Sequence, residues 1–158
     1  MSREEEIYAK YLEILRVKLV AKYDEMGLRA SGKYADELEG ETAPNKLIMW
    51  GANHIEFMEK GRSPGRFPPI NVIEDWIEVK KGLPAIFREK KKQFAFLIAR
   101  KIAREGIQVP NTYNKGKVIE SVVEDFLGND ISQMLEELGD VFIARIKVDV
   151  LQIFKEVA

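Results

Sequence analysis

The sequence predicts a helix-rich α+β fold in a single domain, residues 1–158. Long stretches at both ends carry apolar residues at helical spacing. Between them, residues 46–51 form a short apolar run next to turn formers, which is typical of a strand. Residues 61–69 hold two glycines and three prolines, which disrupt both helices and strands. The expected order is an N-terminal amphipathic helix, a small β-hairpin region, a Pro/Gly loop and several helices, the last one long.

The first helix is expected over residues 3–26. Ser2 is the predicted N-cap, and three glutamates follow it near the positive end of the helix dipole. Gly27 is expected to stop the helix. Its apolar face comprises Ile7, Tyr8, Tyr11, Leu12, Leu15 and Leu19, and the opposite, solvated face comprises Arg3, Glu6, Lys10, Glu13 and Lys18.

The hairpin is expected to pair residues 46–51 with residues 38–42 through a turn at Pro44 and Asn45. Residues 34–38 fit either a short helical turn or the entry to a strand. Residues 52–60 fit a short helix better than a strand. Because of its prolines and glycines, the segment 61–69 is predicted to contain no regular structure.

The second half is predicted to be helical apart from a loop at residues 107–117. A helix over residues 72–79 ends at Gly82, a longer one lies between Pro84 and Gly106, and a short one covers residues 118–127. Asp130 and Gln133 resemble a capping box at the start of the last helix. The longer helix has the stripe Phe87, Phe94, Leu97, Ile98 and Ile102, and the last helix has the stripe Ile131, Met134, Leu135, Leu138, Phe142, Ile146, Val150, Ile153 and Phe154.

The composition argues against several functional classes. With 25 basic and 26 acidic residues, the net charge of −1 is unlike that of a general nucleic-acid binder. The chain has no cysteine, so disulfides and thiolate metal sites are excluded. Its longest apolar runs are far below the roughly 20 residues of a membrane span, and its start lacks the pattern of a signal peptide. We therefore expect no membrane partner.

We expect no catalytic, cofactor-binding or metal site, and hence no enzyme. His54 is the only histidine, and no cysteine, histidine or glutamate stands at metal-ligand spacing from it. A structural or solvated role is favoured for it. The carboxylates lie mostly on charged helix faces, where solvation is the simpler interpretation. An enzyme built on His54 and nearby acids is the weakest of the alternatives.

A basic run at residues 88–92 supports an alternative function. On one helix, Lys90, Lys91 and Lys92 would point in different directions around most of a turn, so a solvated face is favoured over a nucleic-acid contact. The alternative is a small nucleic-acid-binding or regulatory module that uses this cluster, together with Arg100, Lys101 and Arg104.

Two motifs resemble a known family. Residues 58–70 (MEKGRSPGRFPPI), a helix containing Trp76, and residues 95–106 (AFLIARKIAREG) resemble the tail-completion, head–tail joining (neck, tail-component) proteins of tailed bacteriophages. That family typically has a Pro-Gly-Lys-Met-Pro-Pro loop followed by a Trp helix and an Ala/Ile helix. Here Arg66 replaces the loop lysine, and Lys60 and Arg62 replace an aromatic residue and a threonine around Gly61.

The resemblance implies a structural virion protein, a ring-forming connector at the neck or upper tail that joins the portal complex to the tail. Its implied partners are further copies of itself in a homo-oligomeric ring, portal, neck and tail proteins, and DNA passing through the ring lumen. Its implied location is the virion, assembled in the cytoplasm of the host bacterium. The family has no catalytic residues that would apply to this chain.

The loop supplies the candidate subunit interface. Phe67 is a candidate anchor surrounded by polar groups, and arginine suits bidentate pairing with a partner's carboxylates or with phosphate. The other interpretation of Phe67, with equal weight, is that it folds back onto its own core, against Trp76. The candidate contacts are Arg62, Pro64, Arg66, Phe67 and Pro68.

Overall fold

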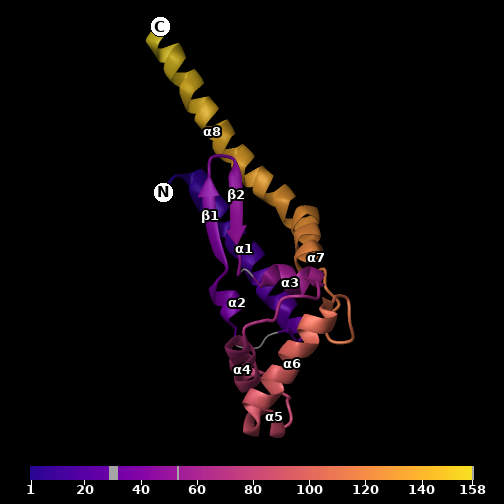
Figure 1. The fold of residues 1–158 in the computed structure, drawn as a ribbon. Coiled ribbons are helices and arrows are strands. Elements are labelled where there is room, and N and C mark those ends of the chain that lie inside the picture. Colours follow the sequence, from indigo (N-terminus) through magenta and orange to yellow (C-terminus); the bar gives the residue numbers. More distant parts are fainter. Residues whose placement is uncertain (29–31, 53, 158) are drawn as a thin grey trace.

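The structure, a computed structural model, describes residues 1–28, 32–52 and 54–157, without the side chains of residues 154, 156 and 157. It confirms the helix-rich α+β fold (Figure 1). Its elements are α1 (Arg3–Glu25), α2 (Lys33–Asp36), β1 (Glu39–Ala43), β2 (Lys46–Trp50), α3 (Ile55–Lys60), β3 (Gly61–Arg62), α4 (Ile70–Val79), α5 (Ile86–Glu89), α6 (Lys91–Glu105), β4 (Ile107–Gln108), α7 (Val118–Asp125), the π-helical segment η1 (Phe126–Asp130) and α8 (Ile131–Val157).

Helix α1 begins at the predicted cap. The backbone N–H of Glu5 donates to Ser2 Oγ at 3.2 Å, and the N–H of Ser2 donates to the Glu5 carboxylate at 2.6 Å. This reciprocal pair is a capping box, which satisfies N–H groups that the first helical turn leaves without partners. Of the predicted apolar face, Ile7, Tyr11, Leu12 and Leu19 are buried.

The hairpin is confirmed with its turn. Strands β1 and β2 pair antiparallel from Glu39 opposite Trp50 to Ala43 opposite Lys46, and Asn45 in the turn has φ 59°. The indole N–H of Trp50 donates across the strands to Glu41 at 3.0 Å. Residues 33–36, left open by the sequence, form the helix α2, and residues 55–60 form α3 as favoured.

The prediction that residues 61–69 contain no regular structure is wrong for the first two. Gly61 and Arg62 form β3, which pairs antiparallel with Gln108 and Ile107 of β4. The three prolines lie further along, so they remove no hydrogen bond from this ladder. Residues 63–69 have neither helix nor strand.

The single helix predicted between Pro84 and Gly106 is two helices. The backbone leaves helical geometry at Lys90 (φ −115°, ψ 38°), between α5 and α6. The expected apolar stripe also needs correction, because Leu97 is 49% exposed. The residues of α6 that pack fully against α4 are the small Ala95 and Ala99, with no measurable exposure. Small side chains at the contact let the two helices approach closely.

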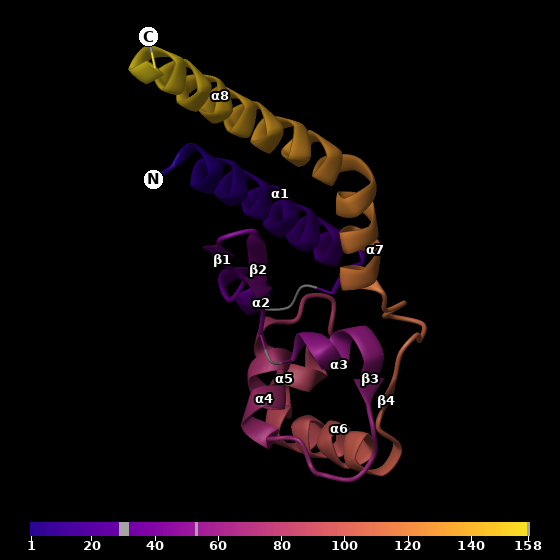
Figure 2. The ribbon, with the colours of Figure 1, turned by 90° about the horizontal axis from the view of Figure 1, so that it is seen from above.

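The predicted break before the last helix is absent. Residues 118–157 run as α7, η1 and α8, with helical backbone at Asp125 and Ile131 on either side of the π-helical turn. The proposed capping box at Asp130 is therefore wrong. A π-helical turn is a recognised cause of helix bending, and Figure 2 shows the direction changing between α7 and the greater part of α8.

Asp130 forms an ion pair with Lys18 of α1 instead of capping a helix. A π-helical turn brings residues i and i+5 to the same side of the helix, so Asp125 and Asp130 lie side by side. The Lys18 ammonium contacts both carboxylates, at 2.6 Å for Asp125 and closely for Asp130. Hydrogen bonds to the two carboxylates raise the pKa of Lys18, and the Lys18 hydrogen bond lowers the pKa of Asp125. The sequence had placed Lys18 on a solvated face.

Among the residues that the structure describes, the core comprises three clusters of buried residues. Helix α1 contributes to two of them: one with α2, α3 and α7, and one with η1 and the first half of α8, in which Phe126 meets the edge of Tyr11. The third lies between α4 and α6. In Figure 2 the α4–α6 unit lies across α3 from the α1–α8 layer. The loop between α3 and α4 therefore belongs to the α4–α6 side of the molecule.

The Lys18 bridge predicts a specific pH dependence. Asp125 has a lowered pKa in the folded protein, so its contribution to stability is present above the unfolded pKa near 3.8 and lost as pH falls through the lower folded value. Lys18→Met should lower the melting temperature at pH 7 and flatten its decline between pH 4 and pH 2, measured by circular dichroism. Lys60→Met, at an exposed pair with Glu56, is the control and should leave both unchanged. A Lys18→Met profile parallel to that of the unmodified protein would contradict the assignment.

Candidate subunit interface

The loop 63–69 is held against the end of α6. The N–H of Gly65 donates to the carbonyl of Ala103 at 2.7 Å. Strand β3, just before Gly65, pairs with strand β4, just after Ala103. Gly106 (φ 72°) and Gly61 (φ 84°) lie where the two segments cross, and a Cβ on either would overlap a backbone carbonyl oxygen of the other segment. Only glycine fits at such a crossing. The loop is therefore pre-formed.

Arg62 stabilises the loop from within. Its guanidinium donates to the carbonyl of Arg66 at 2.7 Å and lies 5.9 Å from the centre of the Phe57 ring. A guanidinium over an aromatic face is a favourable cation–π arrangement. The side chain of Arg62 is therefore half-buried against its own chain, whereas that of Arg66 is exposed.

The remaining candidates divide into exposed and buried residues. Pro64, Arg66 and Phe67 are exposed, and Pro68 is buried. Phe67 is 43% exposed, and its ring lies 5.8 Å from that of Phe96 on α6. One side of the ring rests on its own chain, through Phe96 and not the Trp76 that the sequence suggested, and the rest of the ring faces solvent. Its role as an anchor for a partner stays a prediction.

The sequence did not reveal how much apolar surface surrounds this unit. Helix α4 buries Ile73 and Ile77 and leaves Val72, Trp76 and Val79 exposed on another face. On α6, Phe96 and Leu97 are about half exposed. Apolar residues on more than one face of a helix indicate a further contact. This pattern can be read from the sequence of residues 70–79.

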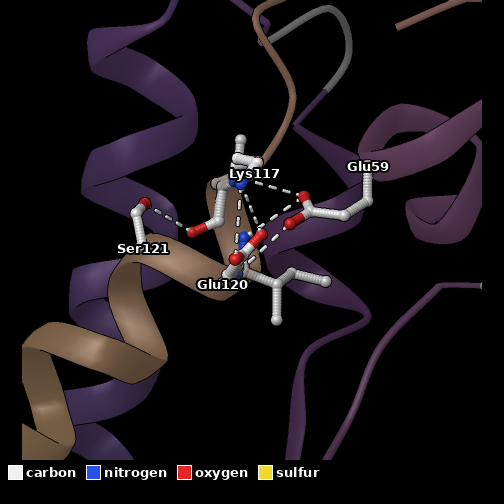
Figure 3. A network of polar contacts seen from close by, with 6 residues as sticks. Glu59, Lys117, Glu120 and Ser121 are labelled. Carbon is white, nitrogen blue, oxygen red and sulfur yellow. Dashed lines mark hydrogen bonds and ion pairs between the residues drawn. The ribbon is translucent and has the colours of Figure 1, made fainter. Parts of the chain in front are cut away.

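Glu59, part of the motif that resembles the phage family, has a structural role that the sequence did not suggest. The residue before α7, Lys117, is in a left-handed conformation, and its side chain does not cap the helix. The Glu59 carboxylate accepts the N–H of Val118 at 2.9 Å and those of Ile119 and Glu120 at 3.2 Å (Figure 3). It therefore satisfies three N–H groups of the first turn of α7 and opposes the positive end of that helix dipole.

The segment before α7 is bound to α3 as well. The side-chain amide of Asn114 donates to the carbonyl of Met58 at 2.7 Å and accepts from the N–H of Gly116 at 2.8 Å. A cleft of about 980 Å³ lies beside this junction, between α3 on one wall and Pro110, Lys115 and α7 on the other. Because the Glu59 carboxylate on its wall already accepts three backbone hydrogen bonds, it is poorly suited to act as a base there.

His54 and the lysine cluster lie apart from the loop. His54 is exposed at the start of α3, and among the described residues no group of three or more histidines and acids is arranged to hold a metal ion. Lys91 pairs with Glu78 at 3.2 Å, and Arg88 donates to the carbonyls of Glu78 and Lys80 at the end of α4. Lys90 and Lys92 are exposed beside the break between α5 and α6.

A search against protein-family models, curated proteins and solved structures finds no match for the chain. No helix in the described ranges has both the length and the apolar character needed to cross a membrane. The resemblance to phage joining proteins and the interface role of the five loop residues stay predictions.

The Glu59 cap can be tested by stability. Glu59→Ala removes the acceptor of three N–H groups at the start of α7, so we expect the free energy of unfolding to fall by about 1–2 kcal/mol. Glu56→Ala, an exposed glutamate on the same helix, should change it by less than about 0.5 kcal/mol. Urea unfolding followed by circular dichroism measures both. Equal effects of the two variants would show that the cap contributes nothing.

Proposed function

We propose that the protein is a non-enzymatic structural subunit of a tailed-phage particle, a ring-forming neck or tail connector that joins the portal complex to the tail. Its partners are then further copies of itself and portal, neck and tail proteins, with DNA passing through the ring lumen. The proposal places it in the virion, after assembly in the host cytoplasm. One observation carries it: the loop of the phage-like motif is pre-formed and presents Arg66 and Phe67 to solvent.

The geometry suits a docking contact for a physical reason. Backbone hydrogen bonds and the Arg62 guanidinium already hold the loop in place, so little conformational entropy is lost when a partner binds. An exposed aromatic ring supported by Phe96, next to an exposed arginine, has the composition of an interface hot spot. A ring needs contacts between unlike surfaces of neighbouring copies, and a loop that meets a different surface of the next subunit satisfies that requirement.

A loop variant tests the proposal in phage particles. Changing Arg66 and Phe67 together to alanine should leave the monomer folded, because both side chains are exposed, and should lower the yield of infectious particles at least about tenfold, as expected for loss of an interface anchor. The yield is measured by complementing a phage that lacks the gene.

The matched control changes Tyr113 and Lys115 to alanine. These residues also put an exposed aromatic ring and an exposed cation on a loop, but in a different segment from residues 63–69. The control should support full yield. If the Arg66/Phe67 variant also gives an unchanged yield, the loop is not a docking contact and the proposal loses its main support.

DNA binding separates the proposal from the nucleic-acid-binding alternative. Since Lys91 and Arg88 are engaged with α4, we expect at most weak DNA binding at ~0.15 M salt, unaffected by changing Lys90 and Lys92 to alanine. The measurement is a fluorescence-anisotropy titration over a range of salt concentrations. Tight binding that weakens steeply with salt and disappears in the double variant would favour the alternative.

A further inference from the structure

The second half of α8 extends beyond the rest of the molecule. Figure 2 shows α8 running alongside α1, and Figure 1 shows the end of α8 extending beyond the N-terminus. Near the N-terminus of α1, Arg145 of α8 forms an ion pair with Glu4 at 2.5 Å. From residue 142 to residue 153 every residue is exposed, although this segment is rich in large apolar side chains.

These apolar residues occupy two faces of the helix. At about 100° per residue, the larger face spans an arc of about 100°; it comprises Phe142, Ile143, Ile146, Val150 and Ile153. The smaller face is centred about 160° away around the helix axis, and it comprises Ala144, Val148 and Leu151. We name them face A and face B. Phe154, which the sequence places on the stripe of face A, lies outside the described side chains.

The exposed apolar surface of α8 lies on both sides of the helix. The large residues of the two faces are each 42–62% exposed. Face A alone exposes roughly 500 Å² of apolar surface, which is within the roughly 300–600 Å² of the largest patch on a typical monomer, and such a patch is often functional. Apolar residues on two opposite faces indicate a helix that is buried on both sides. A two-fold pair through face A alone would leave face B in water.

We propose that the second half of α8 packs between two further copies of this chain, with face A of each copy against face B of the next. Two opposite faces on one helix are what a head-to-tail ring requires, because each subunit then uses one face for each neighbour. The inference rests on the proposed function, because it adds to the loop 63–69 a second contact between neighbouring copies.

The charges between the two faces agree with this arrangement. One polar strip holds Asp140 and Lys147, and the other holds Arg145 and Asp149. Each strip carries one acidic and one basic residue. Where parallel copies of the helix meet, opposite charges can therefore lie near each other. A helix that lies on an anionic membrane has instead an excess of lysine and arginine on its polar side. A second copy of the chain is therefore favoured over a lipid surface.

Three variants of the full chain test the proposal by sedimentation velocity at about 100 µM, where a contact of micromolar Kd is almost fully formed. Ile146→Asp places a charge on face A, and Leu151→Asp places one on face B. Gln152→Asp, outside both faces, adds the same charge as a control. Ile146 and Leu151 are 60% and 61% exposed, so the fold of the monomer should be unchanged in circular dichroism.

We expect the unmodified chain and Gln152→Asp to self-associate, and Ile146→Asp and Leu151→Asp each to be monomeric. An equal mixture of the two monomeric variants should form one-to-one heterodimers, because each supplies the face that the other lacks. Restoration by mixing is specific to a head-to-tail contact.

Three results would overturn the proposal. The unmodified chain could stay monomeric at about 100 µM. Leu151→Asp could associate as well as the unmodified chain, which would indicate a two-fold pair through face A. The unmodified chain could sediment with phosphatidylglycerol vesicles without associating with itself, which would indicate a lipid surface. None of these results depends on particle yield, so a normal or reduced yield with the Arg66/Phe67 variant decides the proposed function separately.

Discussion

The carboxylate of Glu59 is the interaction that joins the two segments carrying the candidate assembly surfaces. It lies at the end of α3, directly before β3 and the loop, and it accepts three N–H groups at the start of α7. Glu59 therefore links the start of the loop to the start of the helical run that ends in α8, although the two are distant in sequence. A helix that has no cap of its own is otherwise free to begin elsewhere or to fray. With Glu59 in place, the start of the continuous run α7–η1–α8 is defined relative to the loop.

The direction of that run is set further along, by α1. Lys18 reaches two acids that a regular α-helix would place on different sides, and η1 brings them together. Beyond this point Lys10 pairs with Glu137 at 2.6 Å, and the same carboxylate accepts the hydroxyl of Tyr11 at 2.8 Å. The bend and these contacts direct the second half of α8 away from the body of the molecule, so its apolar faces remain uncovered by the rest of the chain.

The sequence predicted the elements that depend on local chemistry. The cap at Ser2, the hairpin turn and the ends of the helices near Gly82 and Gly106 were confirmed, because neighbouring residues determine them. The features it missed depend on residues far apart in the chain. The strand at Gly61 pairs with β4, the π-helical turn around Gly128 is bound by Lys18 of α1, and the cap of α7 comes from 59 positions away. For the candidate interface, the sequence predicted the residues of the loop; the support from Phe96 and the internal role of Arg62 required the tertiary contacts.

The crossing of β3 and β4 has a consequence for finding relatives of this chain. Gly61 and Gly106 both lie at positive φ, and a side chain on either would meet a backbone oxygen of the opposite segment, where no rotamer change relieves the overlap. Surface residues of the loop can vary without disturbing this geometry, whereas the two glycines cannot. A distant homologue that keeps the crossing must keep both. The paired glycines, with a glutamate two positions before the first, are therefore a more durable fingerprint of this architecture than the loop sequence that first suggested a family.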